Sequence, residues 1–236
     1  MYDGMCSLML LPYGYYKELE KFGIQSRPFS QIRPVLSTVQ NNRDHRKILV
    51  IDGETVFTGG INLADDYIDR LDRFGHCKDT AVMIKGDAVK SFTYMFLKMW
   101  QVAGKKSGIE QDELKKYILN VSREQCMREF DRDNGLIRSG GYVIPYGDSP
   151  FSSERIGKRV YVDILNRAAK YVHIMTPYLI LDDEMIAALC YCAKRGVETI
   201  IIMPHIPDKV YAYLLARTYY LELIEKGVHI YEYTPG

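Results

Sequence analysis

The strongest constraint on this chain is a short apolar run at residues 47–52, which is closed by the dipeptide Asp52-Gly53. A run of this length that ends in Asp-Gly is typical of a buried strand leading into a tight turn. Residues 55–58 are then predicted to form the return strand. The sequence therefore predicts a two-stranded hairpin, and the side chains on its first strand acquire fixed directions.

Two polar residues, His45 and Lys47, stand at the start of this hairpin. Side chains on a strand alternate between its two faces, so His45 and Lys47 are predicted to point the same way, while Asp52 has the opposite parity. An imidazole beside an ammonium suits an anion with a reactive centre, and phosphate is the obvious candidate. The lysine can supply charge and donors to the non-bridging oxygens. The histidine can attack phosphorus or transfer a proton.

The hairpin belongs to a longer pattern, His-x-Lys-x4-Asp-x6-Gly-Gly-x-Asn, which runs from His45 to Asn62. A single histidine is more often a packed or surface residue than a catalyst, so only the whole pattern carries weight. This pattern resembles the HKD motif, the signature of the phospholipase D superfamily. The resemblance extends to residues 65–67 and 78–80, and residues 42–48 resemble bacterial cardiolipin synthases most closely.

Predicted helices and strands alternate along the chain, which favours an α/β fold with a mostly parallel or mixed sheet. The resemblance implies, more specifically, a phospholipase D-like α/β/α sandwich with a mixed sheet, made of two pseudo-two-fold related domains of which the second is incomplete. Helices are predicted at residues 12–22, 87–102, 153–169, 182–195 and 211–226. Strands are predicted at residues 24–29, 47–52, 55–58, 78–84, 142–145, 171–176, 198–203 and 228–233.

The predicted domain organisation has three parts. Residues 1–103 form a first phospholipase D-like domain that carries the HKD motif, and residues 141–236 form the N-terminal part of a second such domain. Between them, residues 104–140 are polar and highly charged, which is typical of a connecting segment.

An internal repeat supports two similar domains. Residues 15–24 resemble residues 219–228, because Tyr, Tyr, Glu, Leu and Gly coincide at a constant offset. The first copy is followed by His45, whereas the second copy stands close to Gly236. The family's second HKD motif is therefore expected beyond Gly236, and the chain is interpreted as an internal piece of a longer enzyme.

The resemblance also implies roles for the motif residues. His45 is similar to the nucleophile, which forms a phosphatidyl-histidine intermediate, while the histidine of the second motif acts as acid and base. Lys47, Asn62 and Gly60 are implied to bind the substrate phosphate. Asp52 belongs to the catalytic motif, and its strand parity suggests that it supports the loop. Neither a metal nor a cofactor is implied.

The implied reaction is that of a cardiolipin synthase, in which two phosphatidylglycerols give cardiolipin and glycerol. The implied partners are this phospholipid, the surface of the bacterial cell membrane and the missing C-terminal part of the same polypeptide. Membrane attachment would come from segments outside this sequence, since no apolar run approaches the roughly 20 residues needed to span a bilayer. The sequence predicts that this piece itself is soluble or peripheral.

Two alternatives stay open. One is another activity of the superfamily: a phospholipase, a phosphatidylserine synthase or a nuclease. The net charge of +1 argues against nucleic acid as a partner, because such proteins usually carry a basic surplus. The other is a non-catalytic domain that only binds lipid. A metal site is not predicted, because the five cysteines are scattered and form no Cys-x-x-Cys pair.

Overall fold

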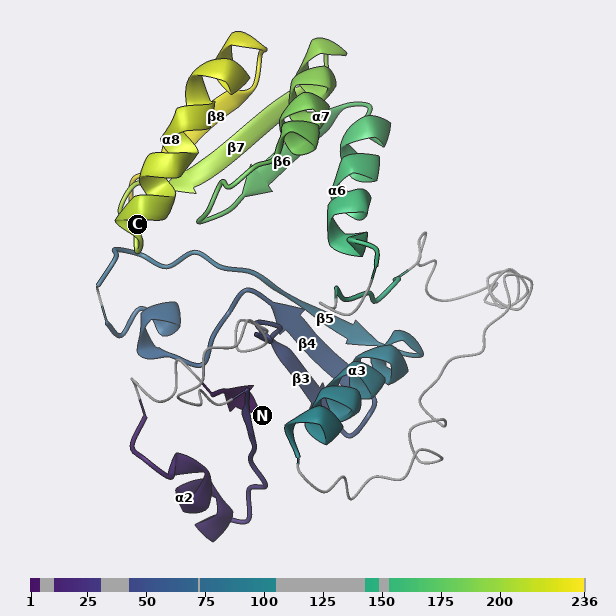
Figure 1. Ribbon diagram of the computed structural model, residues 1–236, viewed down its shortest axis with the longest axis vertical. Helices are drawn as coiled ribbons and strands as arrows, with labels where there is room; N and C mark the ends of the chain where they lie inside the picture. The colour runs from purple at the N-terminus through teal and green to yellow at the C-terminus, as the bar shows by residue number, and fades with distance from the viewer. Residues whose placement is uncertain (5–10, 31–42, 72, 105–142, 149–152, 236) are drawn as a thin grey trace, which may run out of the picture. The chain divides into compact units, whose positions relative to one another are not determined.

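A computed structural model describes residues 1–4, 11–30, 43–71, 73–104, 143–148 and 153–235 (Figure 1). The chain forms two compact units. The first contains Met1–Ile61 and Thr80–Pro145, and the second contains Asn62–Asp79 and Tyr146–Gly236. Asn62–Asp79 thus groups with the second unit, although it lies within the first predicted domain.

The first unit is built around an antiparallel sheet in which β4 lies between β3 and β5. A separate pair of short parallel strands, β1 and β2, lies near the beginning of the chain. The elements are β1 (Tyr2–Asp3), α2 (Tyr15–Lys21), β2 (Pro28–Phe29), β3 (Ile48–Ile51), β4 (Thr55–Gly59), β5 (Ala81–Lys85) and α3 (Ala88–Ala103).

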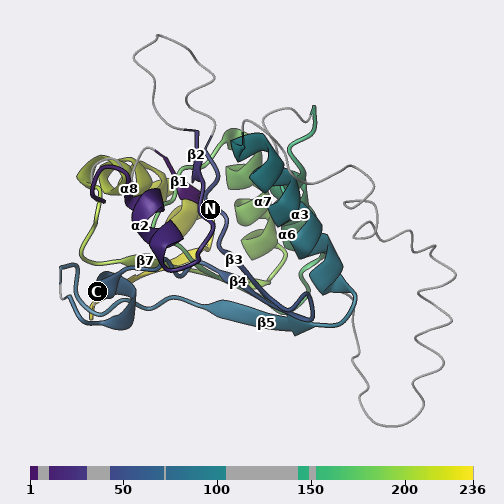
Figure 2. The ribbon, with the colours of Figure 1, turned by 90° about the horizontal axis from the view of Figure 1, so that it is seen from below.

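Helix α3 covers one face of the β3–β4–β5 sheet (Figure 2). Val56 of β4 and Val89 of α3 are fully buried. The opposite face is open, since Leu49, Ile51 and Met83 are 57%, 44% and 58% exposed. The prediction of a strand was correct, but the prediction that it is buried was wrong. Its alternate residues face solvent because α3 packs on one side only.

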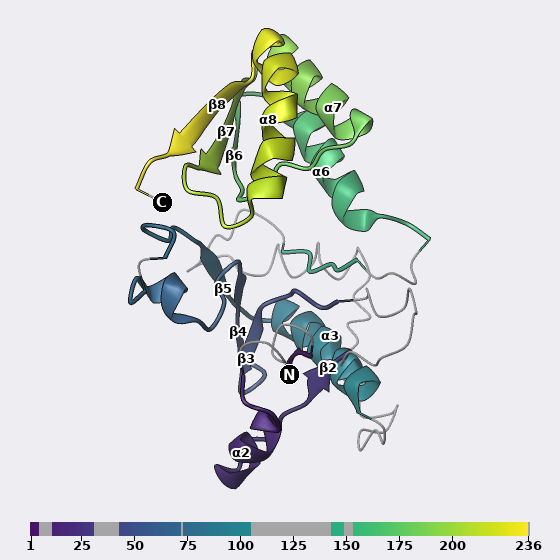
Figure 3. The same ribbon diagram turned by 60° about the vertical axis from the view of Figure 1, so that its left-hand side comes forward.

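The second unit has a parallel sheet in which β7 lies between β6 and β8. Helices α6, α7 and α8 line one side of this sheet (Figure 3). The elements are η2, a 3₁₀ helix (Asp65–Ile68), α6 (Ile156–Arg167), β6 (Tyr171–Met175), α7 (Asp183–Lys194), β7 (Glu198–Pro204), α8 (Val210–Glu225) and β8 (His229–Tyr233).

The core of the second unit lies between this sheet and its helices. Leu189 of α7, Ile201 of β7 and Leu223 of α8 are at most 1% exposed, and burying one such side chain contributes about 1.5–3 kcal/mol. Helix α7 begins where predicted, because the Asp182 carboxylate accepts a hydrogen bond from the backbone N–H of Met185. One face of β7 is fully buried, whereas the alternate residues on its other face are only partly buried.

The expected α/β class with both parallel and antiparallel pairing is confirmed, but several predicted elements are shorter. The strand predicted at residues 24–29 is reduced to Pro28–Phe29. No strand forms at residues 143–145, where Val143 and Ile144 are exposed and lack a neighbouring strand. Residue 142 and nearly all of the predicted connecting segment lie outside the described residues.

Candidate active site

His45 and Lys47 lie in the extended segment directly before β3. Their side chains meet, as strand alternation predicts. The Nζ atom of Lys47 lies 3.1 Å from both ring nitrogens of His45, and it donates a hydrogen bond of 2.8 Å to the His45 carbonyl oxygen. An exposed imidazole and a lysine ammonium are therefore concentrated at one end of the open sheet face.

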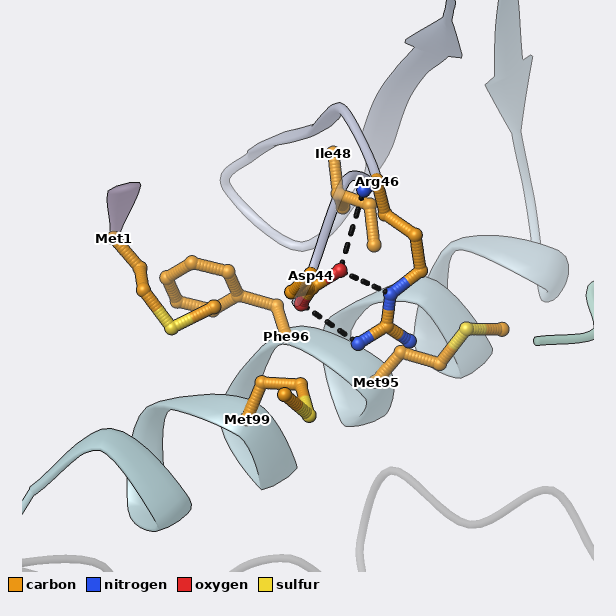
Figure 4. Close-up of a pocket in the computed structure, with 7 residues that line it drawn as sticks. All are labelled: Met1, Asp44, Arg46, Ile48, Met95, Phe96 and Met99. Carbon is orange, nitrogen blue, oxygen red and sulfur yellow. Dashed lines mark hydrogen bonds and ion pairs between the residues drawn. The ribbon is translucent and has the colours of Figure 1, made fainter. Parts of the chain in front are cut away.

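Asp44 and Arg46 have the opposite parity and lie towards α3 (Figure 4). The two oxygens of the Asp44 carboxylate accept hydrogen bonds of 2.8 Å from Nε and from a terminal nitrogen of Arg46. Together with Ile48 they border an open pocket of about 50 Å³, which is completed by Met1, Met95, Phe96 and Met99. The pocket has room for a few water molecules and is far smaller than the roughly 300–1,000 Å³ of typical ligand pockets.

The charges of this pair stabilise one another. Burial alone would raise the pKa of the Asp44 carboxyl, but the hydrogen bonds and the charge of Arg46 outweigh burial and hold that pKa below its usual value. The hydrogen bonds from Asp44 likewise raise the pKa of Arg46. Both groups are therefore charged throughout the physiological pH range.

Arg43 attaches the same segment to the beginning of the chain. One of its terminal nitrogens donates a hydrogen bond of 2.8 Å to the carbonyl oxygen of Ser30, just after β2. The same nitrogen lies 3.6 Å from the Asp3 carboxylate in β1. The segment before β3 is thus held by side-chain contacts on both sides of His45.

Asp52 lies in the turn between β3 and β4, at the other end of β3 from His45. Both Asp52 and Gly53 have positive φ, at 54° and 71°, and the backbone N–H of Glu54 closes the turn onto the carbonyl oxygen of Ile51. Asp-Gly is the dipeptide that such hairpin turns favour. The structure therefore places Asp52 as a turn residue and does not bring it to His45.

The Gly-Gly-x-Asn part of the pattern follows the end of β4. A Cβ atom on Gly59 would overlap the carbonyl oxygen of Thr80, so the close pairing with β5 requires glycine there. The Gly60 backbone N–H donates to the same oxygen at 3.2 Å. Asn62 groups with the second unit, where its side-chain nitrogen donates a hydrogen bond of 2.6 Å to the Tyr67 hydroxyl.

A second polar cluster, which the sequence analysis missed, lies at the carboxyl ends of β7 and β8. His205 Nδ1 lies 2.8 Å from one oxygen of Glu232, and the Tyr213 hydroxyl donates to the other oxygen at 2.9 Å. These hydrogen bonds lower the pKa of the Glu232 carboxyl. The available signal was topological, because adjacent parallel strands bring their carboxyl ends to the same edge of a sheet.

Two further histidines are also engaged with polar neighbours. His76 Nδ1 lies 2.9 Å from the Tyr233 hydroxyl, and the His76 backbone N–H donates to the carbonyl oxygen of Pro235. His173 Nε2 lies 2.7 Å from a carboxylate oxygen of Glu198.

Neither a metal-binding cluster nor a membrane-spanning helix occurs in the part of the chain that the structure describes. The described residues contain no group of three or more His, Cys, Asp or Glu side chains that could hold a metal ion. Within the same residues, no helix is both long and apolar enough to cross a bilayer.

Comparison with known proteins gives one family match. Residues 161–236 match the family model described as "Cardiolipin synthase, PLD-like domain". The matched region lies in the second unit, so it is independent of the pattern around His45.

Relatives match the chain over its whole length. It is 32% identical to a cardiolipin synthase of Halalkalibacterium halodurans and 33% identical to cardiolipin synthase 2 of Bacillus cereus, of which it spans 44% and 43%. It is 52% identical to an uncharacterized protein of Streptococcus mutans, of which it spans 48%. The chain thus spans about half the length of these curated relatives.

Proposed function

This chain belongs to the phospholipase D superfamily as a relative of the cardiolipin synthases, and we propose that it supplies the nucleophilic histidine of a phosphatidyltransferase. The observation that carries this proposal is the pairing of His45 with Lys47, whose Nζ lies 3.1 Å from both ring nitrogens. A nucleophile and a cation side by side suit attack on a phosphodiester, because negative charge grows on the phosphate oxygens during the displacement.

The proposed reaction has two displacements at phosphorus. In the first, a ring nitrogen of His45 attacks the phosphorus of one phosphatidylglycerol, and the bond from phosphorus to the oxygen of the headgroup glycerol breaks. The departing glycerol takes a proton from a second histidine, which we place in the remainder of the polypeptide. In the second, a hydroxyl of another phosphatidylglycerol gives its proton to that histidine and attacks phosphorus. The P–N bond breaks and cardiolipin is released.

The remaining motif residues have supporting roles in this proposal. Lys47 neutralises the phosphate oxygens next to the reacting nitrogen. The Gly60 N–H already donates to the carbonyl oxygen of Thr80, which holds the Gly-Gly segment beside β5. The Asn62 amide carries two N–H donors, and the bond to Tyr67 uses one of them. Asp52 shapes the turn of the hairpin and does not touch the substrate.

A lipid substrate is supported by the open face of the first sheet. Leu49 and Ile51 share the strand parity of His45 and Lys47, and both are exposed. Met83 of β5 pairs across the sheet with Phe57, which in turn pairs with Leu49. A polar reactive end thus continues into an apolar surface, and we propose that the enzyme works at a bacterial membrane surface.

The direct test is His45→Ala in the complete polypeptide, assayed on vesicles of phosphatidylglycerol with mass spectrometry of the lipids. We expect cardiolipin and glycerol from the parent protein and no product from the variant, because the nucleophile is lost while an exposed side chain contributes little to packing. The matched control is His173→Ala, which removes an exposed histidine of β6 in the second unit. Near-normal product from His45→Ala would refute the proposal. Phosphatidic acid from the parent protein, without cardiolipin, would identify a phospholipase instead.

A further inference from the structure

The segment that carries His45 lacks the usual support of a strand. The ladder between β3 and β4 begins at the pair Ile48 and Thr58, so residues 43–47 stand outside it. The direction of the His45 side chain must therefore be set by other contacts. Asp44 and Arg46, its two neighbours in sequence, are joined to each other across it by three hydrogen bonds.

Hydrogen bonds between Asp44 and Arg46 bridge the backbone of His45. The Oδ1 atom of Asp44 accepts the backbone N–H of Arg46 at 3.2 Å, which spans the backbone of His45 in the manner of an Asx-turn. The same carboxylate accepts two parallel hydrogen bonds of 2.8 Å from the Arg46 guanidinium. Two parallel bonds fix orientation as well as distance, so the backbone at His45 has little freedom left.

Packing fixes the side on which this pair lies. The Asp44 and Arg46 side chains are 11% and 32% exposed, and they lie among Met95, Phe96 and Met99 of α3 (Figure 4). Since alternate side chains of an extended segment point to opposite faces, anchoring residues 44 and 46 on α3 directs His45 to the open face, where it meets Lys47.

We propose that Asp44 and Arg46 are positioning residues, which act on the reaction by holding the His45 imidazole in its attacking orientation. This inference rests on the proposed role of His45 as the nucleophile. Neither residue reaches the substrate in this account. Their effect is therefore on the rate of the chemical step rather than on substrate binding.

The kinetic test uses Asp44→Asn, Arg46→Gln and the double variant in the complete polypeptide, assayed on phosphatidylglycerol vesicles. We expect each single variant to lower kcat by up to about 10²-fold with little change in KM, since small displacements of a reacting group have effects of that size. The double variant should be no worse than the poorer single variant, because the two residues act as one unit. Arg46→Lys keeps the positive charge but cannot donate two parallel hydrogen bonds to Asp44. We therefore expect its kcat to lie between those of Arg46→Gln and the parent protein.

The matched control is Arg167→Gln. Arg167 also donates through Nε to a carboxylate, that of Asp163 at 2.7 Å, but this pair is exposed on α6 in the second unit. Its loss should leave kcat unchanged.

A second readout, independent of turnover, is the NMR spectrum of the 236-residue chain labelled at its five histidines. In Asp44→Asn and Arg46→Gln we expect the His45 ring signals to move or broaden. The signals of His76, His173, His205 and His229 should stay in place and so report that the fold is intact.

The outcomes separate this inference from the proposed function. If His45→Ala abolishes activity while both single variants keep a normal kcat and an unchanged His45 signal, the positioning role is wrong and the function stands. If His45→Ala remains active, the function is wrong, whereas a moved His45 signal would still show that the pair orients the ring. Variants that shift all five histidine signals would reveal a merely structural pair and would overturn the inference.

Discussion

His45 and His205 are both exposed histidines next to the end of a strand, but their neighbours have opposite charge. His45 precedes β3 and lies 3.1 Å from the lysine ammonium of Lys47. His205 follows β7 and lies 2.8 Å from the carboxylate of Glu232. The Glu232 carboxylate can accept an N–H from the His205 ring, whereas the Lys47 ammonium carries a positive charge that can attract an anion. The two histidines thus differ in the sign of the charged side chain that lies next to the imidazole.

The two units also differ in how they hold these residues. The second unit has an extensive core in which Ile201 and Leu223 are fully buried, and the His205 cluster lies at the rim of its parallel sheet. In the first unit, Val56 and Val89 are the fully buried hydrophobic residues among those described. His45 is therefore oriented by local hydrogen bonds rather than by a core, which makes it more sensitive to changes in its sequence neighbours.

The largest effect we expect is that the 236-residue chain alone does not turn over phosphatidylglycerol. The proposed reaction needs a second histidine to protonate the departing glycerol, and we place that histidine in the remainder of the polypeptide. The purified chain and the complete polypeptide would be compared at equal concentration by lipid mass spectrometry. Metal-independent activity of the chain alone, lost in His45→Ala, would show that two copies assemble a site and that this expectation is wrong.

The next prediction concerns the charged neighbours of the two histidines, Lys47 beside His45 and Glu232 beside His205. We expect Lys47→Ala to lower kcat by about 10²–10³-fold with a smaller change in KM, as is usual for the loss of one donor to developing charge. Glu232→Gln, the matched change beside His205, should alter kcat by no more than a few-fold. Steady-state kinetics on phosphatidylglycerol vesicles would measure both. A Lys47→Ala variant that changes only KM would make Lys47 a ground-state binder.

We expect Asn62→Ala to lower kcat by about 10²–10³-fold, as for Lys47→Ala, because both residues are proposed to stabilise phosphate charge in the transition state. The matched control is Tyr67→Phe, which removes the hydroxyl that accepts the Asn62 hydrogen bond but keeps the amide. We expect the control to lose far less kcat than Asn62→Ala in the same kinetic assay. Equal losses would mean that Asn62 acts through Tyr67 and not on the phosphate.

The sequence predicted those features that depend on local periodicity. The hairpin, the helix α7, and the meeting of His45 with Lys47 all follow from strand or helix spacing. Burial was predicted poorly, because whether Leu49 faces a helix or solvent depends on what packs across the sheet. The strand parity of Asp52 predicted a supporting role in the loop, and Asp52 does lie in the turn after β3, which separates it from His45 by the length of that strand.

The pairing of Asp44 with Arg46 and the pairing of His205 with Glu232 were not predicted from the sequence, for a related reason. Asp44 and Arg46 lie beside α3, which is distant from them in the sequence, so local spacing does not reveal their surroundings. The pairing of His205 with Glu232 depends on β7 and β8 being parallel neighbours, so that residues far apart in sequence meet at one edge. Contacts of this kind require the topology, which a single sequence specifies only indirectly.

The smallest effect we expect is on stability at the His205 cluster. In Glu232→Gln the carboxylate that accepts from His205 and Tyr213 is lost, and we expect the free energy of unfolding at pH 7 to fall by about 0.5–1.5 kcal/mol, the usual value of such bonds. The pKa of Glu232 is lowered in the folded protein, chiefly by these hydrogen bonds. Its contribution is therefore fully present above the ordinary glutamate pKa of 4.5 and is lost as the pH falls through the lower folded value. Urea denaturation of parent and variant at pH 7, 5 and 3 should give a difference that is constant from pH 7 to 5 and shrinks towards pH 3. A difference that stays constant or grows towards pH 3 would contradict the stabilising role of the ionised Glu232 carboxylate.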